Sequence, residues 1–379
     1  MRSTTPENET EKTVGKGAAK TIGVGIIGSG KIALANHVPG VGLCANARIT
    51  ALCDSNPQLL KEAGTHVPGA ALCPDFHELL RRDDVQAVII STPNFLHAEI
   101  ALAAIAAGKH VLCEKPIAMN LAESRHMYQA AEAAKVRHMA AFTYRFVPAM
   151  RYMHHLVTDG AIGRPYHFRA NRFQDWGDRG LGWRQTRKLA GTGEMGDMLS
   201  HRIDYGHLLI GPIQRLAADW RIFVPHRGGK PADVDDWIAI LARFKHDVSG
   251  VLESSKLTTG RGEGAGSQDY CEVNGEAGSL VFYLQKPLEL LRGKKGGASL
   301  ETVPVPREFQ TWPGSPRDPA DGDPLVTFRW DQDVEFITAI SEDRPCRPSF
   351  REGCQVQAVM DTAAAAAEEG LWLDVPQVD

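Results

Sequence analysis

Two oppositely charged side chains stand where an apolar strand is expected to end. Residues 110–113 read HVLC, and Glu114, Lys115 and Pro116 follow directly. Proline cannot continue a central strand, so the chain must turn here, through a trans or a cis bond. The charged pair is either a solvated turn or a strand end that delivers an ammonium group into a site.

A second candidate for chemistry is an acid and a histidine four residues apart. In GEMGDMLSHRID, the residues Asp197, His201 and Asp204 share one face of an expected α-helix. His201 can act as a general acid or base, and Asp197 would orient it and raise its basicity. The alternatives are helix-surface electrostatics and a metal site, although no further ligand cluster supports a metal.

A glycine-rich turn follows the first apolar strand, TIGVGIIG, in a GxGxxA arrangement. Gly28 permits a tight turn, Gly30 lets the backbone approach a pyrophosphate, and Ala33 allows the next helix to pack closely on the sheet. The phosphates would meet the N–H groups at the start of that helix. The residues expected to contact a dinucleotide here are Gly28, Ser29, Gly30, Lys31 and Ile32.

An acidic residue closes the second expected strand, ARITALCD. Asp54 lies 26 residues after Gly28 and can accept hydrogen bonds from both adenosine ribose hydroxyls. It would repel a 2′-phosphate, and Ser55 and Asn56 bring no arginine to bind one. NAD is therefore favoured over NADP as cofactor.

The third strand ends in STPNFLHAE, at an edge where ligands bind in parallel sheets. Thr92, Pro93 and Asn94 are candidate cofactor contacts. Asn94 also suits the N-cap of the following helix, and both roles can hold together. His97, one turn further on, is either a cofactor contact or a surface histidine.

Strands alternate with helices from residue 21 to residue 142, which predicts a parallel sheet covered on both faces. Later strands between residues 216 and 303 predict a largely antiparallel sheet, followed by helices over 325–343 and 351–369. The expected fold is α/β: a disordered tail (1–20), a Rossmann dinucleotide-binding domain (21–142), and an α+β domain (143–379) with a large, mostly antiparallel open sheet. Helix 351–369 is expected to pack back near the Rossmann domain.

Composition favours a small-molecule enzyme. The 379 residues carry a net charge of −4, with no basic excess for nucleic acid or an anionic membrane. Seven cysteines without a CxxC pair favour a reducing compartment over a zinc site. With no signal core in the first twenty residues and no apolar run of transmembrane length, we expect a soluble cytoplasmic protein.

From residue 22 onward the chain resembles the glucose–fructose oxidoreductase, inositol dehydrogenase and rhizopine-catabolism family (Gfo/Idh/MocA). The resemblance rests on five segments in the family's order: GIIGSGKIA, STPNFLHAE, CEKPIA, YRFVPAMR and GTGEMGDMLSHRIDYGHLLIG. It extends to a C-terminal segment, SFREGCQVQAVMDTAAAAAEEGLWLDVP. One departure is Leu199, where the family usually has glycine; the leucine either narrows the pocket or packs under the helix.

The resemblance implies roles for individual residues. Lys115 would touch both the nicotinamide end of the cofactor and the substrate, and Glu114 would orient the lysine or the backbone beside it. An ammonium next to oxidised nicotinamide is expected to release its proton more easily. Asp197 and His201 correspond to the family's pair facing the nicotinamide. The family also uses one face of its open sheet to oligomerise, which implies a homodimer or homotetramer.

The segment between the strand at 164–173 and the Asp–His helix is rich in tryptophan and hydroxyl-binding groups, which suit a sugar or cyclitol. A polar surface loop is the alternative interpretation. The candidate substrate contacts are Tyr144, Arg145, Asn171, Trp176, Trp183 and Arg184.

The sequence thus predicts an NAD-dependent dehydrogenase that oxidises a secondary ring hydroxyl of a sugar, glycoside or cyclitol. Lys115 and the Asp197–His201 pair would handle the proton. Two alternatives stay open: an NAD-retaining glycoside hydrolase or lyase that works by transient oxidation and elimination, and a non-enzymatic NAD-sensing regulator.

Overall fold

The computed structural model describes residues 21–176, 180, 182–263 and 266–378. Segment 1–20, expected to be a disordered tail, lies outside the described residues. No helix among the described residues combines the length and apolar character that crossing a bilayer needs.

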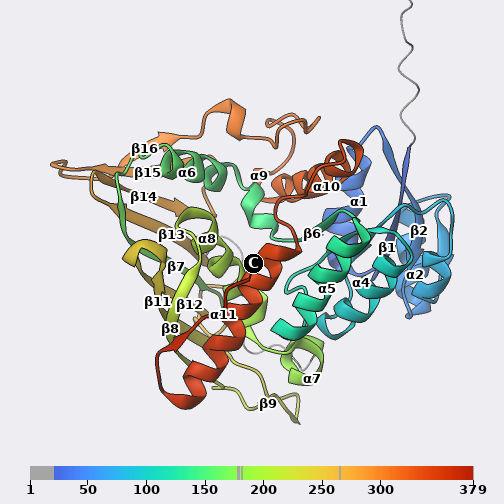
Figure 1. The fold of residues 1–379 in the computed structure, drawn as a ribbon, viewed down its shortest axis with the longest axis horizontal. Helices are drawn as coiled ribbons and strands as arrows, with labels where there is room; N and C mark the ends of the chain where they lie inside the picture. Colours follow the sequence, from blue (N-terminus) through green and yellow to red (C-terminus); the bar gives the residue numbers. More distant parts are fainter. Residues whose placement is uncertain (1–20, 177–179, 181, 264–265, 379) are drawn as a thin grey trace, which may run out of the picture.

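The first part of the chain forms a parallel sheet with strand order β3-β2-β1-β4-β5-β6, shown on the right of Figure 1. Its central strands are buried and apolar because helices cover both faces, so the expected parallel sheet is confirmed. The strands are β1 (Ile22–Ile27), β2 (Ala47–Cys53), β3 (Ala71–Cys73), β4 (Ala87–Ile90), β5 (His110–Cys113) and β6 (His138–Ala140).

The strand order of this sheet reverses between β1 and β4, which opens a crevice at the carboxyl ends of the strands. The residues that directly follow β1, β2 and β5 are Gly28, Asp54 and Glu114. Parallel pairing therefore brings three sequence-distant candidate residues to one edge.

The connecting segments of this domain are mostly helical, and several begin at a capping side chain. Asn56 accepts hydrogen bonds from two N–H groups at the start of α2, and Asn120 accepts one at the start of α5. The helical segments are η1 (Ala33–His37), α1 (Val38–Gly42), α2 (Pro57–His66), α3 (Phe76–Leu80), η2 (Asn94–Leu96), α4 (His97–Ala106) and α5 (Leu121–Ala134).

The second sheet is mixed, with strand order β16-β15-β14-β13-β7-β12-β11-β8-β17. Of its pairs in the described part, only β7 with β12 is parallel, so the expected mostly antiparallel sheet is confirmed. Its strands are β7 (Pro165–Phe173), β8 (Ile213–Arg221), β11 (Trp237–Phe244), β12 (Ser249–Ser255), β13 (Gln268–Gly275), β14 (Gly278–Tyr283), β15 (Glu289–Lys294), β16 (Glu301–Pro304) and β17 (Leu373–Asp374); β9 (His226–Arg227) and β10 (Lys230–Pro231) form a separate short pair.

Helices lie between the second sheet and the Rossmann domain (Figure 1). The red helix α11 packs against both β8 and α5 and so lies against the Rossmann domain. The helical segments are η3 (Thr143–Phe146), α6 (Pro148–Thr158), η4 (Trp183–Gln185), α7 (Arg187–Ala190), η5 (Met195–Leu199), α8 (Ser200–Leu209), η6 (Lys245–Asp247), η7 (Arg307–Phe309), α9 (Pro324–Thr327), η8 (Phe328–Trp330), α10 (Asp331–Ser341) and α11 (Phe350–Glu369).

Three expected helices are less regular than their patterns predict. The helix after the glycine-rich turn passes through the π-helical segment η1, and the Asp–His helix begins with a second π-helical segment, η5. The expected helix over 325–343 is divided into α9, η8 and α10. A π turn holds one extra residue and changes the direction of the side chains within it, and both π segments lie beside the candidate site.

Candidate active site

A cavity of about 860 Å³ lies between the carboxyl edge of the Rossmann sheet and the second domain. It is lined by all the residues expected to contact the cofactor except Ser29, whose side chain is buried beneath it and donates to the Cys53 carbonyl at 3.2 Å. The lining members of that set are Gly28, Gly30, Lys31, Ile32, Asp54, Thr92, Pro93, Asn94, His97, Glu114 and Lys115.

Glycine is needed at positions 28 and 30, at one end of the cavity, for two different structural reasons. Gly28 has a φ of +92°, and a Cβ there would lie 2.6 Å from the carbonyl carbon of Ser91. Gly30 has no other group within 4 Å of an added Cβ, because it faces the open cavity. Gly28 is therefore required by the turn, and Gly30 keeps room for a ligand to approach the backbone.

Asp54 is oriented by backbone N–H groups. Its Oδ2 accepts from Ser29 N at 2.9 Å, and its Oδ1 accepts from Asn56 N at 2.8 Å. The carboxylate still lines the cavity, so its remaining lone pairs can accept from ribose hydroxyls. Together with the clear approach at Gly30, this donor and acceptor set fits an NAD adenosine and pyrophosphate.

The segment after β4 differs from expectation at Asn94. Its side chain does not cap the following helix; instead Nδ2 donates to the Ala190 carbonyl at 2.9 Å. Because Pro93 precedes the helical turn with no side-chain cap, the amide is free to join the Rossmann domain to α7. His97 is fully buried rather than on the surface, and its ring nitrogens lie 2.8 Å from the Pro116 carbonyl and 2.9 Å from the Thr92 carbonyl.

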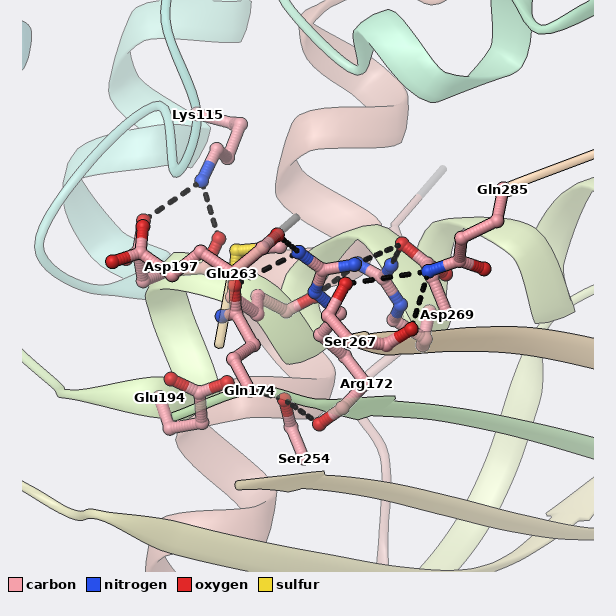
Figure 2. Close-up of polar contacts among 12 residues, drawn as sticks. Lys115, Arg172, Gln174, Glu194, Asp197, Ser254, Glu263, Ser267, Asp269 and Gln285 are labelled. Atoms are coloured by element: carbon pink, nitrogen blue, oxygen red, sulfur yellow. Dashed lines mark hydrogen bonds and ion pairs between the residues drawn. The ribbon is translucent and has the colours of Figure 1, made fainter. Parts of the chain in front are cut away.

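Lys115 reaches across the cavity to the second domain (Figure 2). Its Nζ donates to the backbone carbonyl of Asp197 and lies 3.2 Å from Asp197 Oδ1. The Lys115–Pro116 bond is cis. Burial alone would raise the pKa of Asp197, but the charges of Lys115 and Arg184 outweigh it and lower that pKa. Asp197 is thus a carboxylate shared by two cations.

His201 lies next to this pair without a hydrogen bond to Asp197, so the expected orienting role of Asp197 is not seen. Its ring packs 4.4 Å from Tyr144, centroid to centroid, and Nδ1 is buried with no hydrogen-bond partner among the described residues. Burial and the charges of Lys115, Arg202 and Arg329, with Arg172 a smaller contributor, hold its pKa well below the usual value. His201 is therefore a neutral imidazole, the form that can accept a proton.

Of the expected stripe, Asp197 and His201 line the cavity and Asp204 does not. The π turn of η5 directs Asp197 towards Lys115, while Asp204 forms a two-armed ion pair with Arg145 at 2.6 and 2.8 Å. Leu199 is fully buried and packs in the core under the helix. Among the described residues no group of three or more histidines, cysteines and acids is placed to hold a metal ion.

A polar cluster supports the helix that carries Asp197 and His201 (Figure 2). Asp269 on β13 accepts from the buried Arg202 of α8 and lies 3.4 Å from Arg172 of β7. The carboxylate of Glu194, next to the π turn, accepts from Ser254 of β12 at 2.6 Å. Burial raises the pKa of Glu194 to about 7. The second sheet thus fixes the helix that carries Asp197 and His201 through buried side-chain contacts.

The candidate substrate contacts divide into two groups. Tyr144, Trp183 and Arg184 line the cavity, and the Arg184 guanidinium stacks on the Trp183 ring at 4.2 Å. The other three, Arg145, Asn171 and Trp176, are not among the lining residues. Arg145 is committed to Asp204, and Trp176 is buried with Lys256 over its ring. Residues 177–179 and 181 of the same loop lie outside the described residues.

Sequence reasoning missed Arg329, which enters the cavity from η8. Its guanidinium lies over the ring of Tyr144, 5.2 Å from the centroid, and so joins the cations around His201. No local pattern marks it, because it follows a Pro-, Gly- and Asp-rich loop and reaches the site only through the packing of η8 on η3.

Two family models match the chain. One, described as an oxidoreductase family with an NAD-binding Rossmann fold, matches residues 22–142, and the other, the Gfo/Idh/MocA C-terminal domain, matches residues 150–281. The chain belongs to the Gfo/Idh/MocA oxidoreductases. The expected family and its NAD cofactor are confirmed.

Curated relatives of this Gfo/Idh/MocA oxidoreductase include sugar and cyclitol dehydrogenases. Levoglucosan dehydrogenase of Pseudarthrobacter phenanthrenivorans is 32% identical in an alignment of 358 positions that covers 86% of this chain and 89% of the relative. Myo-inositol 2-dehydrogenase of Thermotoga maritima is 29% identical over 234 residues, 62% and 68% of the two chains. A solved structure of levoglucosan dehydrogenase with NADH superposes with a TM-score of 0.87 at 31% identity, covering 95% of this chain and 100% of the other.

Proposed function

We propose that this oxidoreductase oxidises a secondary ring hydroxyl of a sugar, glycoside or cyclitol with NAD. The observation that carries the proposal is the meeting of Lys115, Asp197 and His201 in the same cavity as Gly30 and Asp54. A similar chain, levoglucosan dehydrogenase, has been solved with NADH and levoglucosan together. NAD, when bound, supplies the acceptor for the hydride.

The protein groups would manage the hydroxyl proton. Lys115 is positioned by Asp197 to donate a hydrogen bond to a substrate oxygen, and that bond would fix the oxygen beside His201. Neutral His201 would then accept the hydroxyl proton. The cations near His201 disfavour the imidazolium, so this base would return its proton readily in the reverse reaction.

Tyr144, Trp183 and Arg184 are the side chains we propose to hold the substrate. The aromatic rings offer flat surfaces for C–H faces, and the guanidinium offers donors for ring hydroxyls. Arg184 also lies 3.6 Å from Asp197 Oδ1, so substrate binding and the Lys115–Asp197 pair share one charge network.

The test is turnover by the purified protein with NAD and a panel of polyols that includes levoglucosan and myo-inositol. Formation of reduced nicotinamide is followed by absorbance, and NAD binding is measured separately by calorimetry. We expect at least one polyol to be oxidised. A protein that binds NAD but oxidises none of the panel would contradict the proposal, and glycoside cleavage without net reduced nicotinamide would indicate the hydrolase class.

We also propose a homo-oligomer that uses the face of the second sheet opposite the helices, and a cytoplasmic location. Support for the first is Leu241 on the inner strand β11, which points away from the buried face and is 52% exposed. Support for the second is that all seven cysteines are free and buried. Light scattering of the wild type and of Leu241→Glu tests the assembly; a wild-type monomer would contradict it.

A further inference from the structure

A buried histidine stands between two carboxylates behind the catalytic lysine. His37, at the end of η1, has its Nδ1 2.9 Å from Asp333 Oδ1 on α10 and its Nε2 3.3 Å from Glu114 Oε1. The side chains of His37 and Asp333 are fully buried, and that of Glu114 is 16% exposed. Three segments that are far apart in the chain thus meet in one charged row.

The packing is arranged to let Asp333 reach His37. A Cβ at Gly40 would lie 2.5 Å from Asp333 Oδ2, so only glycine at this position of α1 allows α10 to come this close. The contact joins the helix after the dinucleotide turn to the C-terminal part of the chain. The contact therefore requires glycine at position 40, and this requirement argues that the His37–Asp333 ion pair has a role of its own.

The charges show that His37 is the cation of the row. Burial alone would lower the pKa of His37, but Asp333 and Glu114 outweigh it and raise that pKa to about 10. Burial alone would raise the pKa of Glu114, but His37 and then Lys115 hold it below its usual value. Glu114 is thus a carboxylate whose charge is mainly offset by an imidazolium.

This arrangement matters because Lys115 has two carboxylates within its surroundings. Glu114 is its chain neighbour, yet Glu114 Oε2 accepts only the backbone N–H of Lys115, at 3.2 Å. The ammonium turns to Asp197 instead. Without a cation beside it, the half-buried Glu114 carboxylate would be unpaired and next to the ammonium, and the attraction would draw the ammonium away from Asp197.

We propose that His37 is a positioning residue for Lys115: by neutralising Glu114 it leaves the ammonium free to bind Asp197 and face the substrate. Asp333 holds the imidazolium in place. The packing of α10 against α1 therefore sets the direction of the Lys115 ammonium, which lies just after the end of β5. The inference rests on the proposed role of Lys115 in turnover.

The first experiment is a double-mutant cycle with NAD and the polyol found by the panel, or levoglucosan if several react. We expect His37→Gln to lower kcat about 100-fold, the size of effect that small misplacements of a reacting group produce. KM for NAD should stay within about 3-fold, since none of the residues expected to contact adenosine is touched. Glu114→Gln alone sets the reference rate for the double variant, because it removes the negative charge while the glutamine oxygen still accepts the Lys115 N–H.

The decisive variant is the double substitution His37→Gln with Glu114→Gln. It removes the charge that His37 neutralises, so its kcat should return to that of Glu114→Gln alone. A merely structural histidine would give a double variant as slow as His37→Gln or slower, and that result would overturn the inference. If His37→Gln does not fold, as judged by circular dichroism, Asp333→Asn replaces it in the same cycle with the same two outcomes.

A readout independent of turnover is the crystal structure of His37→Gln. We expect Lys115 Nζ within hydrogen-bond distance of Glu114 rather than Asp197; an unmoved Lys115 would overturn the inference. Failure of the proposed function gives a different result from failure of this inference. If Lys115 has no role in turnover, a Lys115 variant would turn over substrate at the wild-type rate, whatever the rates of the His37 variants.

Discussion

The two ends of the cavity hold their charges in different ways. At the adenosine end, Asp54 is fixed by two backbone N–H groups within the same βαβ unit. At the catalytic end, Lys115 is fixed by Asp197, a residue 82 positions away on the other domain. The first arrangement survives any relative movement of the domains, and the second exists only when the domains are docked.

This difference separates binding from chemistry. The groups at the adenosine end all come from one domain, whereas Lys115 and Asp197 meet only between the domains. Substitutions at the catalytic end should therefore affect kcat and leave cofactor affinity nearly unchanged, and those at the adenosine end should do the opposite. Four substitutions test this separation, from the largest expected effect to the smallest.

Lys115→Met should lower kcat about 1,000-fold, because the ammonium that binds the reacting oxygen is lost while the methionine keeps most of the volume. Initial rates of nicotinamide reduction measure this, with Lys61→Met on the exposed face of α2 as the matched control. NAD affinity from calorimetry should change less than about 3-fold. An equal loss in affinity would erase the proposed separation of the two ends.

His201→Asn should lower kcat about 100-fold, since the proton acceptor is lost. The wild-type pH profile sharpens this. Because burial and the nearby cations hold the pKa of His201 well below 6.5, the neutral base persists on acidification, and kcat/KM should not fall between pH 8 and pH 6.5. A loss of activity centred near pH 6.5 that is absent in His201→Asn would show that the histidine titrates normally. His126→Asn, on the exposed face of α5, is the control.

Asp54→Ser should weaken NAD binding about 30-fold, as expected when charge-assisted hydrogen bonds to ribose worth about 2 kcal/mol are lost. Saturating NAD should restore kcat to within about 2-fold of wild type. Calorimetry and steady-state kinetics measure the two quantities, with exposed Asp83→Ser as the control. A kcat that stays low at saturation would link the adenosine end to the chemistry.

Gly30→Ala should weaken NAD binding about tenfold, because the methyl group enters the space left for the pyrophosphate. It meets no protein atom within 4 Å, so the melting temperature should be unchanged. Gly28→Ala is the matched contrast: its positive φ and the close Ser91 backbone should cost about 1–3 kcal/mol of folding stability. Equal effects of the two alanines on melting would show that Gly30 is not there for the ligand.

The sequence predicted that Gly28, Gly30 and Asp54 lie together because the contacts that place them are local. The strand, the turn, the helix and the acid after the next strand lie within about 30 residues, so spacing alone constrains their geometry. The second sheet was predicted in type but not in strand order. Lys115 was identified from the motif that follows the fourth strand, and Asp197 and His201 from a second motif, not because the contacts between them could be derived.

The errors concern side chains whose direction depends on distant partners. Asn94 fits a local capping rule, but the Ala190 carbonyl, 96 residues away, binds its amide. Arg145 was expected in the cleft, but Asp204 on α8 binds it. His37 gave no signal at all, because both of its carboxylates belong to other segments, one of them 296 residues away.

The π turn of η5 makes the direction of the Asp197 carboxylate depend on the number of residues in the turn. Deleting one of its residues other than Asp197 would restore regular α-helical bonding and redirect the side chains left inside the turn. Asp197 would then face away from Lys115, although both side chains remained in the chain. In this fold a single-codon insertion or deletion can therefore gain or lose this geometry in one step.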